Sequence, residues 1–368
     1  MDSCADHMHG GPDADGVPLH DFSTNANALG PCPPVLDRLR RTVPDTYPDP
    51  AYVALRERLA SWHGVSARQI VMGASASELI VRVTAALVPA AVSVWIPRHA
   101  YGDYRRAALA WGLTVQRWED ASRTALSSDF LSARAPRLIW VTAPGSPQGD
   151  LSPALALLQE AVQPGDVLVV DCAYAPLCLE PTGRVIGDAS RVCRLFSPNK
   201  ALGMTGVRGG YLVLPASVAE SAQARAPSGA DAWGARLAQL APSWPLGSYG
   251  AAMLMAWPEA DVQQWLAQAR QQLSPWKGML LDGLRQRGWQ VLPGVTNFCC
   301  ARAPMSVEDV SALLPALRHH GIKVRDATSF GLPGHVRFGV RSPQSQMALW
   351  RALDAYHPAP RDSLRDRF

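Results

Sequence analysis

Val167-Leu168-Val169-Val170-Asp171-Cys172-Ala173-Tyr174 is a short apolar run that ends in a carboxylate. A continuous run of aliphatic residues is typical of a strand buried on both faces, as in a parallel sheet covered by helices on both sides. A second run, residues 192–196, ends in Ser197-Pro198-Asn199-Lys200. Because ligands bind beyond the carboxyl ends of the strands in open α/β sheets, we expect the polar residues after both runs to line a site.

A regular pattern of segments surrounds these two runs. Between about residues 52 and 215, helix-like and strand-like segments alternate, which indicates an α/β domain with a doubly wound, mainly parallel sheet. Seven strands are predicted, near residues 69–72, 92–96, 113–118, 138–142, 167–170, 192–196 and 211–214. After about residue 250, long amphipathic helices alternate with short strands, which predicts a smaller α+β domain. We therefore expect an N-terminal segment (1–45), a large domain (46–250) and a small C-terminal domain (251–368).

Composition excludes several classes of protein. The 368 residues are 48% hydrophobic and 18% charged, with a net charge of +4. No apolar run is long enough to span a bilayer, and the N-terminus does not resemble a secretory signal. The basic residues form no nucleic-acid patch, and the seven cysteines show no metal-ligand spacing. We expect a cytoplasmic protein without a metal, nucleic acid or membrane partner, and much of the polar stretch 1–20 is expected to be mobile.

The polar residues at the two strand ends form a motif. Asp171 and Tyr174 are followed by Ser197, Lys200 and, eight residues later, Arg208. This spacing resembles the class I/II aminotransferase family, the fold-type-I enzymes that use pyridoxal 5′-phosphate (PLP). The resemblance implies that Lys200 binds PLP as a Schiff base and moves the proton at the substrate α-carbon, while Asp171 pairs with the ring nitrogen. Tyr174 would bind the ring's phenolic oxygen, and Ser197 and Arg208 the phosphate.

Further segments extend the resemblance over nearly the whole chain. Residues Ser75, Ala76 and Ser77 open a helix and would contribute to the phosphate site. In a segment beginning at His99, Tyr101 would stack on the PLP ring. Tyr47, in a Tyr-Pro segment, would reach the cofactor phosphate of the neighbouring subunit in a homodimer. Ser146 stands where the family usually has an asparagine that binds the phenolic oxygen, which is a departure from the pattern.

The substrate is suggested by residues near both ends of the chain. Arg337 matches the family's arginine for the substrate α-carboxylate, and Arg325 matches one found where the substrate carries a second anion. His9 and Asn27 lie in segments that resemble the L-threonine-O-3-phosphate decarboxylases of cobalamin biosynthesis, in which they would help bind phosphate and carboxylate. We therefore expect a decarboxylase-like enzyme acting on a phosphorylated or anionic amino acid. A histidinol-phosphate-type or other aminotransferase is the alternative, and a non-catalytic relative with the same fold is the second.

Overall fold

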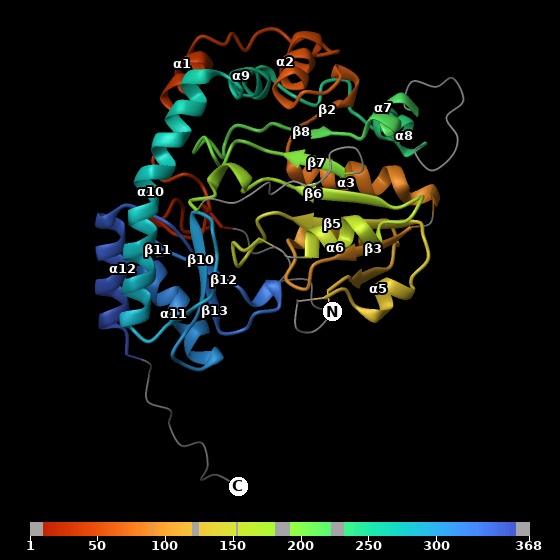
Figure 1. Cartoon of the computed structure of the whole chain (residues 1–368). Coiled ribbons are helices and arrows are strands. Elements are labelled where there is room, and N and C mark those ends of the chain that lie inside the picture. Colours follow the sequence, from red (N-terminus) through yellow and green to blue (C-terminus); the bar gives the residue numbers. More distant parts are fainter. Residues whose placement is uncertain are drawn as a thin grey trace.

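The computed structural model describes residues 10–90, 92–119, 125–151, 154–180, 192–221 and 232–357, and its centre is a seven-stranded sheet (Figure 1). The strand order is β2-β8-β7-β6-β5-β3-β4, and β8 alone runs antiparallel to its neighbours. Their bounds are β2 Ile70–Gly73, β3 Ser93–Ile96, β4 Val115–Arg117, β5 Arg137–Thr142, β6 Val167–Asp171, β7 Val192–Phe196 and β8 Gly210–Val213. The predicted mainly parallel sheet of seven strands is therefore confirmed.

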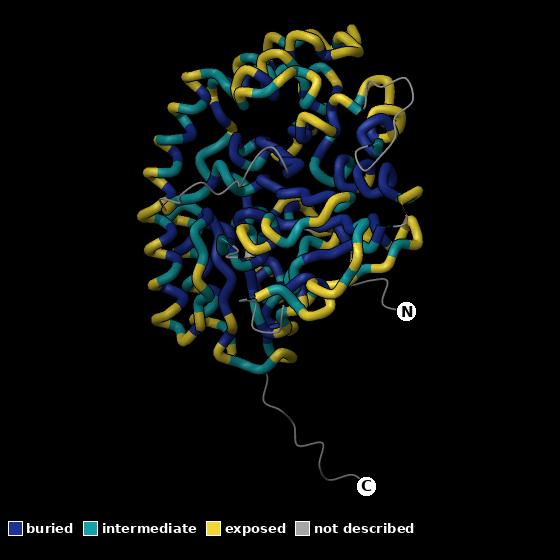
Figure 2. The backbone as a smooth tube through the Cα atoms, turned by 45° about the vertical axis from the view of Figure 1, so that its right-hand side comes forward, coloured by how far each residue is buried: buried dark blue, intermediate teal, exposed yellow. Residues whose placement is uncertain are grey.

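Both faces of this sheet are buried, which explains the continuous apolar runs. On β5, Leu138 and Trp140 belong to one hydrophobic cluster, and Ile139 and Val141 belong to the cluster on the opposite face. Figure 2 shows the resulting arrangement, with a buried centre and exposed positions along the outer helices. The helices of this part are α1 Pro33–Arg40, α2 Val53–His63, α3 Ala76–Leu87, α4 Gly102–Ala110, α5 Ser128–Ser132, α6 Ala154–Ala161, α7 Ala216–Ser221, α8 Trp233–Gln239 and α9 Ser248–Ala256.

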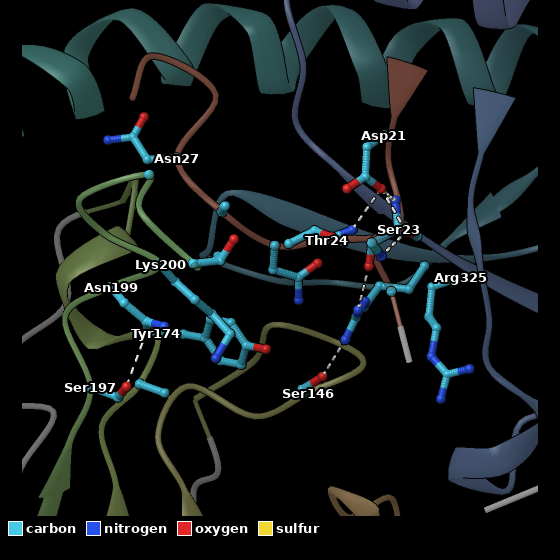
Figure 3. Close-up of a pocket in the computed structure, with 18 of the residues that line it drawn as sticks. Asp21, Ser23, Thr24, Asn27, Ser146, Tyr174, Ser197, Asn199, Lys200 and Arg325 are labelled. Atoms are coloured by element: carbon cyan, nitrogen blue, oxygen red, sulfur yellow. Dashed lines mark hydrogen bonds between the residues drawn. The ribbon is translucent and has the colours of Figure 1, made fainter. Parts of the chain in front are cut away.

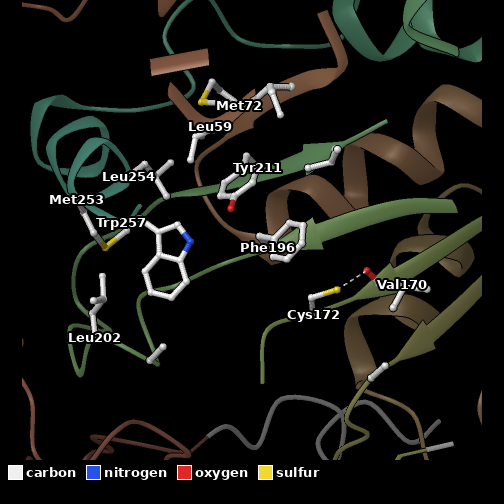
Figure 4. Close-up of a cluster of buried hydrophobic side chains, with 14 of the residues drawn as sticks. Leu59, Met72, Val170, Cys172, Phe196, Leu202, Tyr211, Met253, Leu254 and Trp257 are labelled. Atoms are coloured by element: carbon white, nitrogen blue, oxygen red, sulfur yellow. Dashed lines mark hydrogen bonds between the residues drawn. The ribbon is translucent and has the colours of Figure 1, made fainter. Parts of the chain in front are cut away.

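Large apolar side chains hold the central strands in place. Phe196, the last residue of β7, stacks on Tyr211 of β8 with ring centroids 5.2 Å apart, and Met253, Leu254 and Trp257 belong to the same cluster (Figure 4). Well-packed cores of this kind restrict movement of the strands that they anchor. The strand end that leads into Ser197 and Lys200 therefore starts from a fixed position.

A second, smaller group of strands follows in the chain. The antiparallel sheet β12-β13-β10-β9 contains β9 Gln290–Val291, β10 Phe298–Arg302, β12 Arg325–Asp326 and β13 His335–Gly339. Helices α10 Ala260–Gln286, α11 Val307–His319 and α12 Pro343–Ala355 cover it (Figure 1). We propose the domain boundaries 45/46 and 250/251, since the two sheets share no strand. Among the described residues, no helix is long and apolar enough to cross a membrane.

The N-terminal segment joins the two parts. Strand β1 (His20–Asp21) pairs in parallel with β11 (Ile322–Lys323) of the small domain. A few residues later, Gly30 packs against Gly203 so closely that a Cβ on Gly203 would lie 2.5 Å from the Gly30 Cα. Gly203 also has a φ of +64°, which favours glycine. Residues 10–20, which we expected to be largely mobile, are held by ion pairs of Asp13 with Arg318 and Lys323.

Candidate active site

The carboxyl ends of β5, β6 and β7 meet at one edge of the sheet, as Thr142 pairs in register with Asp171, and Asp171 with Leu195. The Asp171 carboxylate is buried there, with its Oδ1 accepting from the Ala173 N–H at 2.9 Å. Its Oδ2 accepts from the Tyr104 hydroxyl at 2.8 Å. Burial raises the pKa of Asp171, whereas these two hydrogen bonds and the charge of Lys200 lower it. The site therefore contains a buried carboxylate that favours a cationic ligand.

Lys200 faces the same cavity. The chain has only three lysines, and the other two are engaged, Lys277 with Glu180 and Lys323 with Asp13. The Lys200 Nζ lies 5.3 Å from the centroid of the Tyr174 ring. Figure 3 shows Lys200 and Tyr174 on one side of the cavity and Arg325 on the other. The two residues on which the sequence argument depended, Lys200 and Asp171, thus line one cavity.

A group of anion-binding elements lies at one end of this cavity. Ser75 is the N-cap of α3, with its Oγ accepting from the Glu78 N–H, and Ala76 and Ser77 form the first helical turn. The backbone N–H groups of a first turn have no partner within the helix and carry a partial positive charge. Ser197 and Arg208 line the same cavity. Together these groups are suited to a phosphate.

Two buried arginines on the small sheet also line the cavity. Arg337 on β13 donates from Nη1 to the Ser146 Oγ at 2.9 Å and from Nη2 to the Ser23 carbonyl at 2.8 Å. Arg325 on β12 donates to the Ser329 Oγ at 2.8 Å. Burial first, and then the nearby charge of Arg337, lower the pKa of Arg325 to about 10. Two buried guanidinium groups that repel each other in this way are poised to bind an anion.

The cavity has a volume of about 750 Å³. Five cationic side chains line it, Lys200, Arg208, Arg325, Arg337 and Arg341, against two carboxylates, Asp21 and Asp171. Tyr101 also lines it, with its hydroxyl 3.3 Å from the Ser77 Oγ. An enclosure of this charge and size suits ligands with more than one anionic group.

Comparison with known proteins agrees with this geometry. The family model described as aminotransferase class I and II matches residues 18–355. The chain belongs to this family. It is 29% identical over 351 residues to a histidinol-phosphate aminotransferase from Paramagnetospirillum magneticum, covering 91% of each chain, and 26% identical to one from Hyphomonas neptunium, covering 91% of this chain and 89% of the relative.

Solved structures show the same fold. Histidinol-phosphate aminotransferase from Sinorhizobium meliloti, in complex with pyridoxal-5′-phosphate, matches with a TM-score of 0.76 and 21% identity, covering 90% of this chain and 88% of that chain. L-threonine-O-3-phosphate decarboxylase from Porphyromonas gingivalis matches with a TM-score of 0.72 and 20% identity, covering 90% and 98%. This class I/II aminotransferase is thus an enzyme of fold type I, and its cofactor is PLP.

The residues of this aminotransferase fit the cofactor. PLP carries an aldehyde, a ring nitrogen that can be protonated and a phosphate. The cavity offers a lysine, a buried carboxylate and a helix N-terminus beside an arginine, namely Lys200, Asp171, α3 and Arg208. The sequence argument missed Tyr104, because its hydrogen bond to Asp171 joins residues 67 positions apart in the chain.

Two predicted site residues, Asn27 and Ser146, line the cavity but have partners within the protein. The Asn27 amide is engaged within the protein, donating to the Ala201 carbonyl and accepting from the Leu29 N–H. Ser146, expected near the cofactor's phenolic oxygen, accepts from Arg337. Tyr47 does not line the cavity of its own chain and is 77% exposed, stacked on Trp244. His9 lies outside the described residues.

Proposed function

We propose that this enzyme is an aminotransferase of the histidinol-phosphate type, which transfers an amino group to or from a phosphorylated amino compound. The observation that carries the proposal is the pair Arg325 and Arg337, cross-strand neighbours on β12 and β13 whose mutually repelling guanidinium groups both line the cavity. Because α3 and Arg208 already suit the cofactor phosphate, this second cationic group suits an anion of the substrate. The histidinol-phosphate aminotransferases among the relatives support the same reading.

We assign the cofactor contacts to the residues named by the motif. PLP, when bound, supplies an aldehyde for the amino group and an electron-withdrawing ring. Lys200 would hold the aldehyde end and then carry the proton to and from the substrate α-carbon through its Nζ. Asp171 would keep the ring nitrogen protonated, and Tyr174 would donate to the phenolic oxygen. The phosphate would be bound by Ser75, Ala76, Ser77, Ser197 and Arg208, and Tyr101 would lie against the ring.

The substrate end involves fewer groups. Arg337, oriented by Ser146 and the Ser23 carbonyl, would bind one substrate anion through its unpaired Nε and its remaining N–H groups. Arg325, held by Ser329, would bind the same anion where the substrate has only one, as histidinol phosphate does, or the second anion where it has two. We propose that His9 helps to bind the substrate phosphate and that Asn27 lies near the substrate carboxylate. The Asn27 amide is engaged with the chain next to Lys200, which favours a role in holding the Lys200 loop in place.

A decarboxylase is the second candidate. The segment that contains Asn27 resembles the threonine-phosphate decarboxylases, and one of these enzymes is among the structural neighbours. The two reactions differ in which bond at the α-carbon is held perpendicular to the cofactor ring, and small differences in substrate pose decide this. A decarboxylase would place the enzyme in cobalamin biosynthesis. For either reaction we propose a cytoplasmic homodimer.

One set of assays separates these functions. The protein is reconstituted with PLP, reduced with borohydride and digested, and we expect the label on Lys200, with Lys200→Ala as the matched variant that retains none. Unreduced enzyme is then incubated with histidinol phosphate plus 2-oxoglutarate, and separately with L-threonine O-3-phosphate. Glutamate formation in the first mixture is expected. Release of carbon dioxide from L-threonine O-3-phosphate, without glutamate in the first mixture, would favour the decarboxylase. In the labelling experiment, label on Lys277 or Lys323 would contradict the assigned site.

A further inference from the structure

The segment that crosses the cavity between β1 and Gly30 contains two neighbouring side chains, Thr24 and Asn25, whose polar atoms are buried without a partner among the described residues. Asn25 lines the cavity and is only 2% exposed. Its Oδ1 and Nδ2 are both buried, and neither has a partner in the part of the chain that the structure describes. Burying an amide without partners is unfavourable, and native proteins rarely leave one in this state without a reason.

Asp21 and Asn27 of the same segment do not share this property, whereas the Thr24 hydroxyl does. Asp21 accepts from the Ser23 N–H and hydroxyl. The Asn27 amide uses both of its ends within the protein. Asn25 therefore differs from Asp21 and Asn27 in having an unused donor and an unused acceptor, while Thr24 has a single unused hydroxyl.

Asn25 lies beside the binding end of Arg337. The backbone carbonyl of Ser23, two residues earlier, accepts from the Arg337 Nη2 at 2.8 Å. The Asn25 carbonyl accepts from the Asn297 Nδ2 at 3.2 Å, and the next residue, Phe298, has its ring 5.7 Å from the Arg337 guanidinium carbon. The Arg337 Nε is itself buried without a partner. Two unused donors, the Nε and the Asn25 Nδ2, thus belong to one small region of the cavity.

We propose that the side-chain amide of Asn25 binds the substrate by donating from Nδ2 to the anionic group that Arg337 holds. This rests on the proposed function, in which Arg337 binds a substrate anion. The shared chemistry is an oxyanion, from the carboxylate of an amino acid or the phosphate of a phosphorylated amino compound. The Asn25 Oδ1 is then free to accept a hydrogen bond from a donor on the substrate. An apolar side chain of the same size has no such acceptor.

Substitutions separate binding from packing. Asn25→Leu keeps the volume but removes the amide, Asn25→Ala removes both, and Asn25→Asp replaces the donor with a charge that repels an anion. Gln69→Leu is the matched control, since the Gln69 amide donates to the Leu214 carbonyl at 2.7 Å and does not line the cavity. Each protein is loaded with PLP and reduced with borohydride, so that it cannot turn over, and is titrated by calorimetry with succinate and with glycerol 3-phosphate.

We expect Asn25→Leu and Asn25→Ala to weaken binding of at least one probe about tenfold, as loss of a hydrogen bond to a charged group does, and Asn25→Asp to weaken it further. Loss for succinate alone identifies a carboxylate as the partner, and loss for glycerol 3-phosphate alone identifies a phosphate. The melting temperature without ligand should not fall in Asn25→Leu, because no bond is lost. Gln69→Leu should show the reverse, a lower melting temperature with unchanged affinity.

Unchanged affinity for both probes in all three variants would overturn the inference and leave the amide bound to an ordered water only. Wild-type protein that retains PLP but binds neither probe would overturn it as well. Failure of the wild type to retain PLP at all would instead overturn the proposed function, so the two failures are distinguishable.

Discussion

Asp171 carries a free-energy cost in the protein without its cofactor. Because burial raises the pKa of this carboxyl above its ordinary value, the ionised form is less favourable in the folded than in the unfolded chain. The cost is absent below the unfolded pKa, grows as the pH rises from the unfolded to the folded pKa, and is complete above the folded pKa. The hydrogen bond from Tyr104 reduces the cost, and a cationic ring nitrogen beside the carboxylate would reduce it further.

We therefore predict that Tyr104→Phe weakens PLP binding about tenfold, the effect of losing one hydrogen bond to a charged acceptor. Without the Tyr104 hydroxyl, the pKa of Asp171 rises further, so the loss of affinity should grow as the pH is lowered. Fluorescence titration of the apoprotein with PLP measures both effects. Tyr52→Phe is the control, because the Tyr52 hydroxyl donates to the Leu246 carbonyl at 2.8 Å away from the cavity. Equal losses of affinity in the two variants would contradict the role of Tyr104.

Sequence reasoning finds a site residue when it belongs to a motif at a strand end. Lys200 and Asp171 were found in this way, because a short apolar run places its next polar residue at the ligand edge of the sheet. Tyr104 and Asn25 were not found. Their significance depends on which atoms remain unpaired or meet across the fold, and spacing along one chain does not encode that.

At the scale of elements, the N-terminal segment 10–20 is the least expected feature. Asp13 accepts from Arg318 at 2.7 Å and pairs with Lys323 at 2.8 Å, and the Lys323 Nζ donates to the Gly11 carbonyl. These hydrogen bonds and charges hold the pKa of Asp13 well below its ordinary value. Because the pKa of this carboxyl is lowered, the contact contributes its full stability at any pH above the unfolded pKa. That stability is lost only as the pH falls toward the folded pKa. The segment should thus stay docked throughout the neutral range.

We predict that Asp13→Asn loosens residues 10–20 without unfolding the enzyme. Backbone amides of this segment, such as that of Gly11, should exchange with deuterium faster than in the wild type, while those of β6 stay protected. Since Gly10, Gly11 and Pro12 line the cavity, substrate KM should rise while PLP affinity stays unchanged. Asp15→Asn is the control, because the Asp15 side chain makes no ion pair among the described residues. Unaltered exchange in Asp13→Asn would show that other contacts dock the segment.

The strands and most helices were predictable because their sequences obey simple periodicities. The run 192–196 is observed as β7 Val192–Phe196, and the run 167–170 is observed as β6 Val167–Asp171. The docking of residues 10–20 was not predictable. Their polar composition is typical of a mobile leader, and a pair of basic residues about 300 positions away reverses that expectation.

The whole molecule presents aromatic side chains on one outer region, near α1, α2 and α9. Tyr47 is 77% exposed, and its ring stacks on Trp244 with centroids 4.4 Å apart. The Trp244 indole N–H donates to the Pro48 carbonyl, which fixes the pair. An exposed but preordered tyrosine that does not reach its own cavity is suited to contact a second copy of the chain. This arrangement agrees with the proposal that Tyr47 serves the neighbouring subunit.

Mixing two inactive variants tests that proposal. In a hybrid dimer of Tyr47→Ala and Lys200→Ala subunits, a tyrosine that acts across the interface restores one complete site, made of Lys200 from one subunit and Tyr47 from the other. A tyrosine that acts within its own subunit leaves both sites defective. We expect each variant alone to bind PLP weakly or to lack activity. The co-refolded mixture should regain both tight PLP binding and activity in about half of the sites of the hybrid dimers. This is because symmetry gives each hybrid one repaired and one doubly defective site. Co-refolded wild type and Lys200→Ala, which also yields one intact site in each hybrid, sets the level of full recovery.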